Sequence, residues 1–134
     1  MPLSTNTQNP LTQALNLPTR NKWTHRAAAE YLHCSRATVA IYAVTICPVI
    51  SDFRAECPRD IKGGIKSGFS LSQYQFWVLV KTIMFARLLK ADLNGASYRQ
   101  ELKQTICKGQ AHLSRAAYRY EIEMSDISDD AAVA

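Results

Sequence analysis

Between positions 24 and 46, apolar residues follow the spacing of two short helices that pack on each other. Two adjacent alanines, Ala28 and Ala29, would let these helices cross closely. The second helix is expected to run from Arg36 to about Ile46, because Pro48 disfavours helix at the residue before it. With a tight turn between them, the pair predicts a helix-turn-helix, a unit that places its second helix in the DNA major groove. Its apolar seam is predicted to contain Leu32, Cys34, Val39 and Tyr42, extended by Val44 and Ile46.

Residues 48–71 break the helical rhythm with prolines and glycines. Two β-prone pieces, Val49-Ile50-Ser51 and Gly68-Phe69-Ser70-Leu71, predict a small β-hairpin. The adjacent glycines Gly63-Gly64 suit its tight turn. We expect this hairpin to be the wing of a winged helix-turn-helix.

Three further helices are predicted after the wing. The first is capped by Ser72 and runs from Gln73 to about Ala91, ending at an Asn94-Gly95 turn. The others run from Ser97 to about Ile106 and from Ala111 to about Met124. The apolar stripe of the first is wider than one core-facing surface requires, which favours a second role in self-association. The predicted dimerisation residues are Phe76, Trp77, Val80, Met84, Leu113 and Tyr120.

The expected fold class is therefore mainly α, a winged helix-turn-helix with a small β-hairpin wing and C-terminal dimerisation helices. Residues 1–21 are polar and rich in proline, which predicts a flexible N-terminal arm. Residues 22–106 form the predicted DNA-binding domain, and 107–124 form a C-terminal helix for dimerisation. Residues 125–134 are acidic or small and are expected to fray.

Charge is distributed unevenly along the 134 residues, which carry a net charge of +5. Residues 1–19 have no charged side chain, and the end of the chain after Arg119 is acidic. Positive charge is therefore concentrated around the helix-turn-helix and the wing, where it would neutralise phosphates. Arg36 is the best candidate for a bidentate contact to guanine or phosphate. The predicted DNA-binding residues are Thr24, Arg26, Ser35, Arg36, Ala37, Thr38, Ala40, Ile41, Arg54, Arg59, Lys62 and Lys66.

Other kinds of site find little support in the sequence. The four cysteines lack the paired spacing of a structural zinc site, so we expect no metal and no cofactor. No catalytic box, P-loop or Gly-rich dinucleotide motif is present, so no enzyme is predicted. The first residues are too polar for a signal peptide, and no apolar run is long enough to span a membrane. We therefore expect a cytoplasmic protein with reduced thiols.

The order of predicted elements resembles MerR-type winged helix-turn-helix regulators over about residues 24–106. Ser35, Thr38, Val39 and Tyr42 match the second helix of that family, Gly68-Phe69 the aromatic end of its wing, and Gly95-Ala96-Ser97 the start of its fourth helix. The chain departs from the family pattern in two places: His33 stands where glycine is usual, and the run Ala40-Ile41-Tyr42-Ala43 replaces an Arg-Tyr-Tyr-Glu run.

The resemblance implies a compact regulator with a dimerising helix and no small-molecule effector. In size and layout the chain is similar to the repressors that accompany type V-K CRISPR-associated transposons. The predicted function is a homodimeric, sequence-specific DNA-binding transcriptional regulator, more specifically a repressor of promoters. Two alternatives remain: an excisionase-like factor that bends DNA, and a helical protein–protein adaptor or antitoxin.

Overall fold

The computed structural model describes residues 14–64, 69–92 and 96–133. Within these ranges the chain is mainly helical and contains no β-strand, so the predicted α class is confirmed and the β-hairpin wing is wrong. Lys66, Gly68 and the Asn94-Gly95 turn lie outside the described residues, as do residues 1–13 of the predicted arm. The elements are α2 (His25–Leu32), α3 (Arg36–Ile46), α4 (Ser51–Ala55), α5 (Gln73–Asp92), α6 (Ala96–Lys108), the 3-10 helix η1 (Gln110–Leu113) and α7 (Arg115–Val133).

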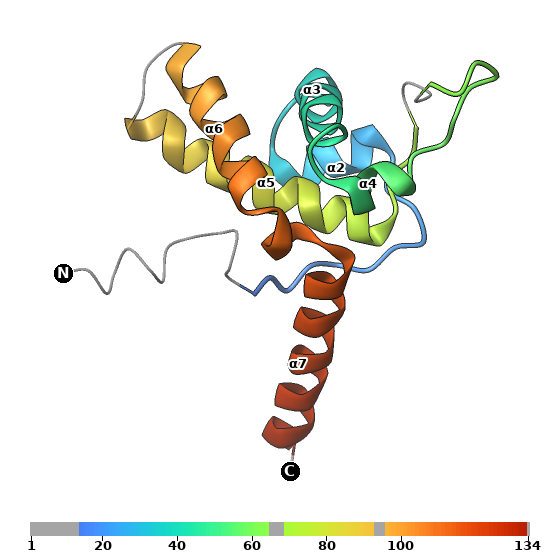
Figure 1. The fold of residues 1–134 in the computed structure, drawn as a ribbon. Coiled ribbons are helices and arrows are strands. Elements are labelled where there is room, and N and C mark those ends of the chain that lie inside the picture. The colour runs from blue at the N-terminus through green and yellow to red at the C-terminus, as the bar shows by residue number, and fades with distance from the viewer. Residues whose placement is uncertain (1–13, 65–68, 93–95, 134) are drawn as a thin grey trace.

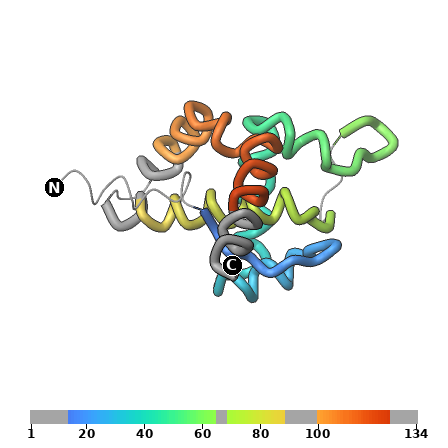
Figure 2. The backbone as a smooth tube through the Cα atoms, turned by 90° about the horizontal axis from the view of Figure 1, so that it is seen from below, coloured from blue at the N-terminus to red at the C-terminus, as the bar shows by residue number. Residues whose placement is uncertain are grey.

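Helix α5 is the centre of the fold and contacts α3, α4, α6 and α7 (Figures 1 and 2). Every residue from Tyr74 to Ile83 is buried, although a surface helix buries only one stripe. The wide apolar stripe, for which we predicted a second role in self-association, is therefore largely core. Phe76, Trp77, Val80 and Leu113 are at most 2% exposed, Met84 is half-buried, and Tyr120 is exposed.

A reciprocal pair of hydrogen bonds fixes the start of α5. The Gln75 backbone N–H donates to Ser72 Oγ at 3.1 Å, and the Ser72 N–H donates to Gln75 Oε1 at 3.0 Å. This is a capping box, which satisfies two backbone donors at the exposed end of a helix. The Gln75 side chain also donates to the carbonyl of Phe53 at 3.0 Å and so ties α4 to α5. The predicted cap at Ser72 is confirmed.

The residues predicted to form the wing have other partners. Val49 and Ile50 each donate a backbone N–H to the carbonyl of Ile46 at 2.9 Å, and α4 follows directly. Burial of Ile50 and Phe53 in the core favours this helical path over an extended one. Leu71 forms an isolated antiparallel bridge with Trp23, with backbone hydrogen bonds of 2.7 Å in both directions. The first β-prone piece therefore continues into a short helix, and the end of the second pairs with a segment distant in sequence.

Helix α7 leaves the body at its first turns and projects away from it (Figure 1). Glu121 anchors it: the carboxylate accepts hydrogen bonds from Lys81 Nζ at 2.8 Å, Trp77 Nε1 at 2.9 Å and the Leu15 N–H at 3.0 Å. Residues 14–21, part of the predicted arm, thus run past α7 and α5, where Leu15 and Leu17 are partly buried. The flexibility of the arm stays a prediction.

Candidate nucleic-acid interface

The predicted helix-turn-helix is present as α2 and α3. Thr24 Oγ1 accepts the backbone N–H of Ala27 at 3.0 Å, which caps the start of α2. Ala28 and Ala29 are buried against the core, so their small side chains permit the close packing of α2 on α3 that their position predicted. The cap at Thr24 and the two alanines are local features of the sequence, and they explain where α2 begins and how it packs on α3.

A left-handed residue makes the turn between the two helices. His33 has φ 57° and ψ 48°, and the Cys34 N–H donates to the carbonyl of Ala29 at 3.0 Å, the 6→1 bond of a Schellman motif. Arg87 of α5 donates to the carbonyl of Leu32 and satisfies another free carbonyl at the end of α2. The turn is therefore held by its own backbone and by the central helix.

Helix α3 begins at a capped end and presents one face to solvent. Ser35 Oγ accepts the Thr38 N–H at 3.1 Å, and the two hydroxyls lie 3.0 Å apart, so the predicted cap is confirmed. The buried side of α3 is formed by Val39, Ala43 and Ile46. Val44, which we predicted to extend this seam, instead points to solvent and is 73% exposed. The solvent face contains Arg36, Ala37, Ile41 and Val44, with Thr38 and Ala40 half-buried at its edge.

Exposed basic side chains occur on α2, α3 and α4 and in the loop after α4. Arg36, Arg54, Arg59 and Lys62 are exposed, and none forms an ion pair with another described residue. Arg26 makes only an exposed contact with Glu30, at 3.6 Å. In Figure 1, α3 and the loop of residues 58–64 rise from the same side of the body, whereas α7 points the opposite way. The described bases among the predicted DNA-binding residues are thus open to an anionic partner.

The acidic residues between these bases are occupied within the chain. Asp52 accepts the backbone N–H of Arg115 at 2.9 Å and so caps α7. Glu56 forms an ion pair with the Arg115 guanidinium and accepts the hydroxyl of Ser72. Asp60 Oδ1 accepts the N–H groups of Lys62 and Gly64, both at 2.9 Å. Their charges are partly compensated by these donors, which reduces the repulsion that they would exert on phosphate.

The Asp60 turn takes the place of the predicted hairpin turn. The Asp60 N–H donates to the carbonyl of Gly64 at 2.8 Å, and Gly63 has φ +86°, a conformation that L side chains rarely adopt. Lys62 stands on this turn beside Ile61, whose side chain is fully exposed. Arg59 and Lys62 therefore lie on a tight loop and not on the predicted β-hairpin wing, since no strand occurs among the described residues.

One histidine stands at the start of α2 with a buried ring nitrogen. His25 opens α2, its ring packs edge-on against Phe69 with centroids 6.0 Å apart, and its Nε2 is buried without a hydrogen-bond partner in the described part of the chain. Burial lowers the pKa of His25 below its ordinary value of 6.5, and a backbone hydrogen bond to Phe69 opposes this shift. The neutral form is therefore favoured at neutral pH.

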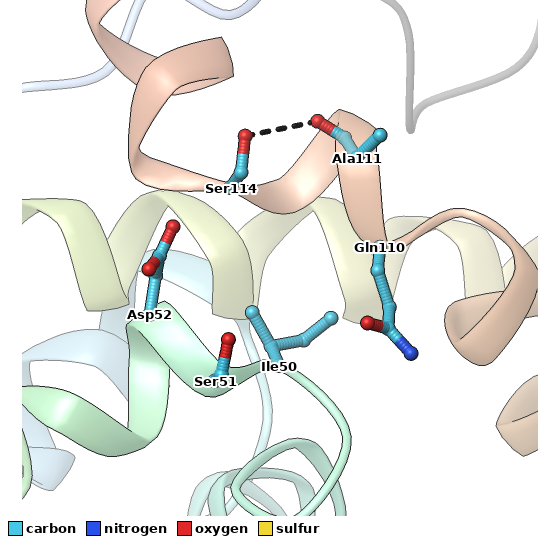
Figure 3. A pocket seen from close by; sticks show the side chains of 6 residues that line it. All are labelled: Ile50, Ser51, Asp52, Gln110, Ala111 and Ser114. Atoms are coloured by element: carbon cyan, nitrogen blue, oxygen red, sulfur yellow. Dashed lines mark hydrogen bonds between the residues drawn. The ribbon is translucent and has the colours of Figure 1, made fainter.

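Two buried thiols and a surface hollow lie beside α4. Cys47 and Cys57 lie 3.9 Å apart as free buried thiols, and burial raises the pKa of Cys57 to about 12, which disfavours the reactive thiolate. No group of three or more metal-binding side chains occurs among the described residues. A hollow of about 380 Å³ is lined by Ser51, Gln110 and the Asp52 carboxylate that already caps α7 (Figure 3).

Sequence reasoning missed several side chains that shape the interface. Val44 had the right spacing from Ile41 to share its solvent face, a signal that we assigned to the core. The roles of Arg87 and Arg115 depend on contacts with residues more than 50 positions away, which no local pattern reveals. Of the predicted set, only Lys66 lies outside the described residues.

Within residues 14–64, 69–92 and 96–133, no helix combines the length and apolarity needed to cross a lipid bilayer. The chain matches no protein-family profile, no curated protein and no solved structure. The resemblance to MerR-type regulators, and the link to type V-K transposons that it implies, therefore stay predictions.

Proposed function

We propose that the protein binds double-stranded DNA sequence-specifically through α2 and α3, and represses transcription by occupying promoter DNA. The observation that carries the proposal is the solvent face of α3: a capped helix, fixed on the core, with exposed bases on the helix itself and on the loop at the same side of the body. A helix-turn-helix uses such a face to enter the major groove, about 12 Å wide, while flanking bases contact phosphates. The carboxylates of Asp52, Glu56 and Asp60 are bound by donors within the chain, which supports a surface of positive charge.

Arg36 is the main polar reader in this proposal. It is the first residue of α3, is exposed, and has no ion-pair partner among the described residues. Its planar guanidinium suits two hydrogen bonds to guanine O6 and N7. Arg54, Arg59 and Lys62 would contact phosphates, which adds affinity and salt dependence without a sequence code.

The proposed assembly is a homodimer through α7. This helix projects on the side opposite to α3, so pairing there leaves the DNA-binding face open (Figure 1). Tyr120 and Met124, one helical turn apart, are 65% and 43% exposed. A two-fold dimer would read two half-sites, and the operator would then be palindromic.

The experiment is a titration of selected duplex DNA with the full-length chain and with Arg36→Ala. We expect Arg36→Ala to weaken specific binding by about 1–3 kcal/mol, the worth of one bidentate base contact. Lys103→Ala is the control, because Lys103 is an exposed base on α6, outside the residues proposed for DNA binding and dimerisation. Unchanged discrimination between selected and random duplexes in Arg36→Ala would exclude Arg36 as a reader.

A protein-binding role is the second candidate, and one observation favours it. Ile41 and Val44 form an exposed apolar pair that would also suit a protein partner. Stoichiometric capture of a protein, together with indifference to DNA at moderate salt, would select this function over the first.

A further inference from the structure

The solvent face of α3 offers few polar groups for reading bases. The hydroxyl of Thr38 is engaged with Ser35 at 3.0 Å, and the hydroxyl of Thr45 donates to the carbonyl of Ile41 at 2.9 Å. Arg36 is the one charged residue in the helix. Beyond its first turn, α3 therefore cannot distinguish base pairs mainly through hydrogen bonds from its side chains.

The same face is continuous in apolar atoms. Ala37, Ile41 and Val44 follow one another at intervals of four and three residues, the spacing of a single helical stripe. Ile41 is 59% exposed and Val44 is 73% exposed. In the major groove only thymine offers an apolar group among the four standard bases, its 5-methyl. Arg36 on the same helix, and Arg54 and Arg59 in the segment that follows it, are exposed, and α3 and the 58–64 loop lie on the same side of the body (Figure 1). This positive charge favours a polyanion over an apolar protein as the occupant of the stripe.

We infer that α3 reads thymine methyl groups through Ala37, Ile41 and Val44, next to one guanine bound by Arg36. The inference rests on the proposed DNA-binding function and specifies the sequence that this function recognises. Arg36 and Val44 are eight positions apart, a rise of about 12 Å along the helix. At about 3.4 Å per base pair, this distance spans between three and four base-pair steps. The half-site therefore contains a guanine with thymines within about four base pairs of it.

Replacing thymine by uracil tests this directly, because uracil pairs identically and lacks only the methyl group. The probe is a duplex selected from a random pool by the full-length protein, resynthesised with deoxyuridine at one thymine at a time. We expect binding to weaken about fourfold at each contacted thymine, the equivalent of one buried methyl group. Uracil outside the selected motif should have no effect.

Two variants identify the readers. Ile41→Ala and Val44→Ala should each bind the thymine duplex less tightly and lose the sensitivity to uracil at one position. This is expected because the substitution in the protein and the loss of the methyl group from the base remove the same contact. Ile61→Ala, which removes a fully exposed isoleucine outside α3, should retain the full sensitivity.

The outcomes distinguish the thymine readout from DNA binding itself. Specific binding that is unaffected by uracil at every position overturns the thymine readout and leaves DNA binding intact. Failure to select any sequence overturns both. If the apolar stripe instead binds a second copy of the chain, Ile41→Ala and Val44→Ala will dissociate an oligomer in light scattering without DNA, which also contradicts the inference.

Discussion

Glu121 provides the sharpest test of how α7 is fixed to the body. Its carboxylate is the shared acceptor of Lys81 Nζ at 2.8 Å, Trp77 Nε1 at 2.9 Å and the Leu15 N–H at 3.0 Å. The Lys81 side chain is 2% exposed and that of Glu121 is 11% exposed, so water cannot readily replace the bonds. Glu121→Leu keeps a side chain of similar size and removes the acceptor for all three donors.

The expected cost follows from this burial. Breaking a buried ion pair by removing one partner costs about 3–5 kcal/mol of stability. We therefore expect Glu121→Leu to lower the free energy of unfolding by about 3–5 kcal/mol and the melting temperature by about 10–20 °C. Glu121→Gln retains an amide oxygen as acceptor for Trp77 or Leu15 and should cost less, about 1–3 kcal/mol.

Urea denaturation followed by far-UV circular dichroism and by fluorescence of the buried Trp23 and Trp77 measures these losses. Glu123→Leu, two residues further along the exposed part of α7, is the matched control and should change stability by no more than about 0.5 kcal/mol. If Glu121→Leu proves no more destabilising than Glu123→Leu, the carboxylate does not hold α7.

Two further predictions concern the histidines around α2, and both are read by the same denaturation assay. His33→Gly should raise the free energy of unfolding by up to about 1 kcal/mol, because glycine adopts the left-handed conformation of φ 57° without the side-chain penalty; a loss of stability would contradict this. The lowered pKa of His25 means that the unfolded chain binds more protons between the folded-state pKa and 6.5. Stability should therefore fall as the pH decreases below 6.5, and His25→Gln should lose this part of the pH dependence; identical pH profiles for the two proteins would refute the assignment.

Local chemistry made the helix-turn-helix predictable. Thr24, Ser35 and Ser72 each accept a backbone N–H at the start of a helix, which is what a hydroxyl before an apolar-periodic run predicts. Pro48 placed the end of α3 near Ile46, where the helix ends. These features depend on neighbours within about four residues, so no knowledge of the fold was needed.

The wing and the dimer stripe failed because they depend on distant partners. Leu71 pairs with Trp23, 48 positions earlier in the chain, and Phe53 is drawn into the core, where Gln75 binds its carbonyl. A run of strand-forming residues indicates only that the segment suits burial. A short helix such as α4 can bury such residues as well. Likewise, the breadth of the apolar stripe around Trp77 indicated burial on several sides, and intramolecular neighbours supply it.

The candidate site was predictable as a set of residues but not as a surface. The sequence placed Asp52, Glu56 and Asp60 among the bases without revealing that each has a partner within the chain. Spacing identified Arg36 and Ile41, whereas the exposure of Val44 required the direction in which α3 packs against α5. The proposed recognition surface is therefore more apolar than the sequence alone predicted.

Sequence-specific DNA binding is the central claim, and the ratio of two dissociation constants tests it most directly. The full-length protein is titrated, at about 0.15 M salt, into a fluorescent duplex selected from a random pool and into a scrambled duplex of the same composition. We expect the selected duplex to bind at least about 10³-fold more tightly, the lower bound for specific recognition. Equal affinity for the two duplexes would contradict the claim.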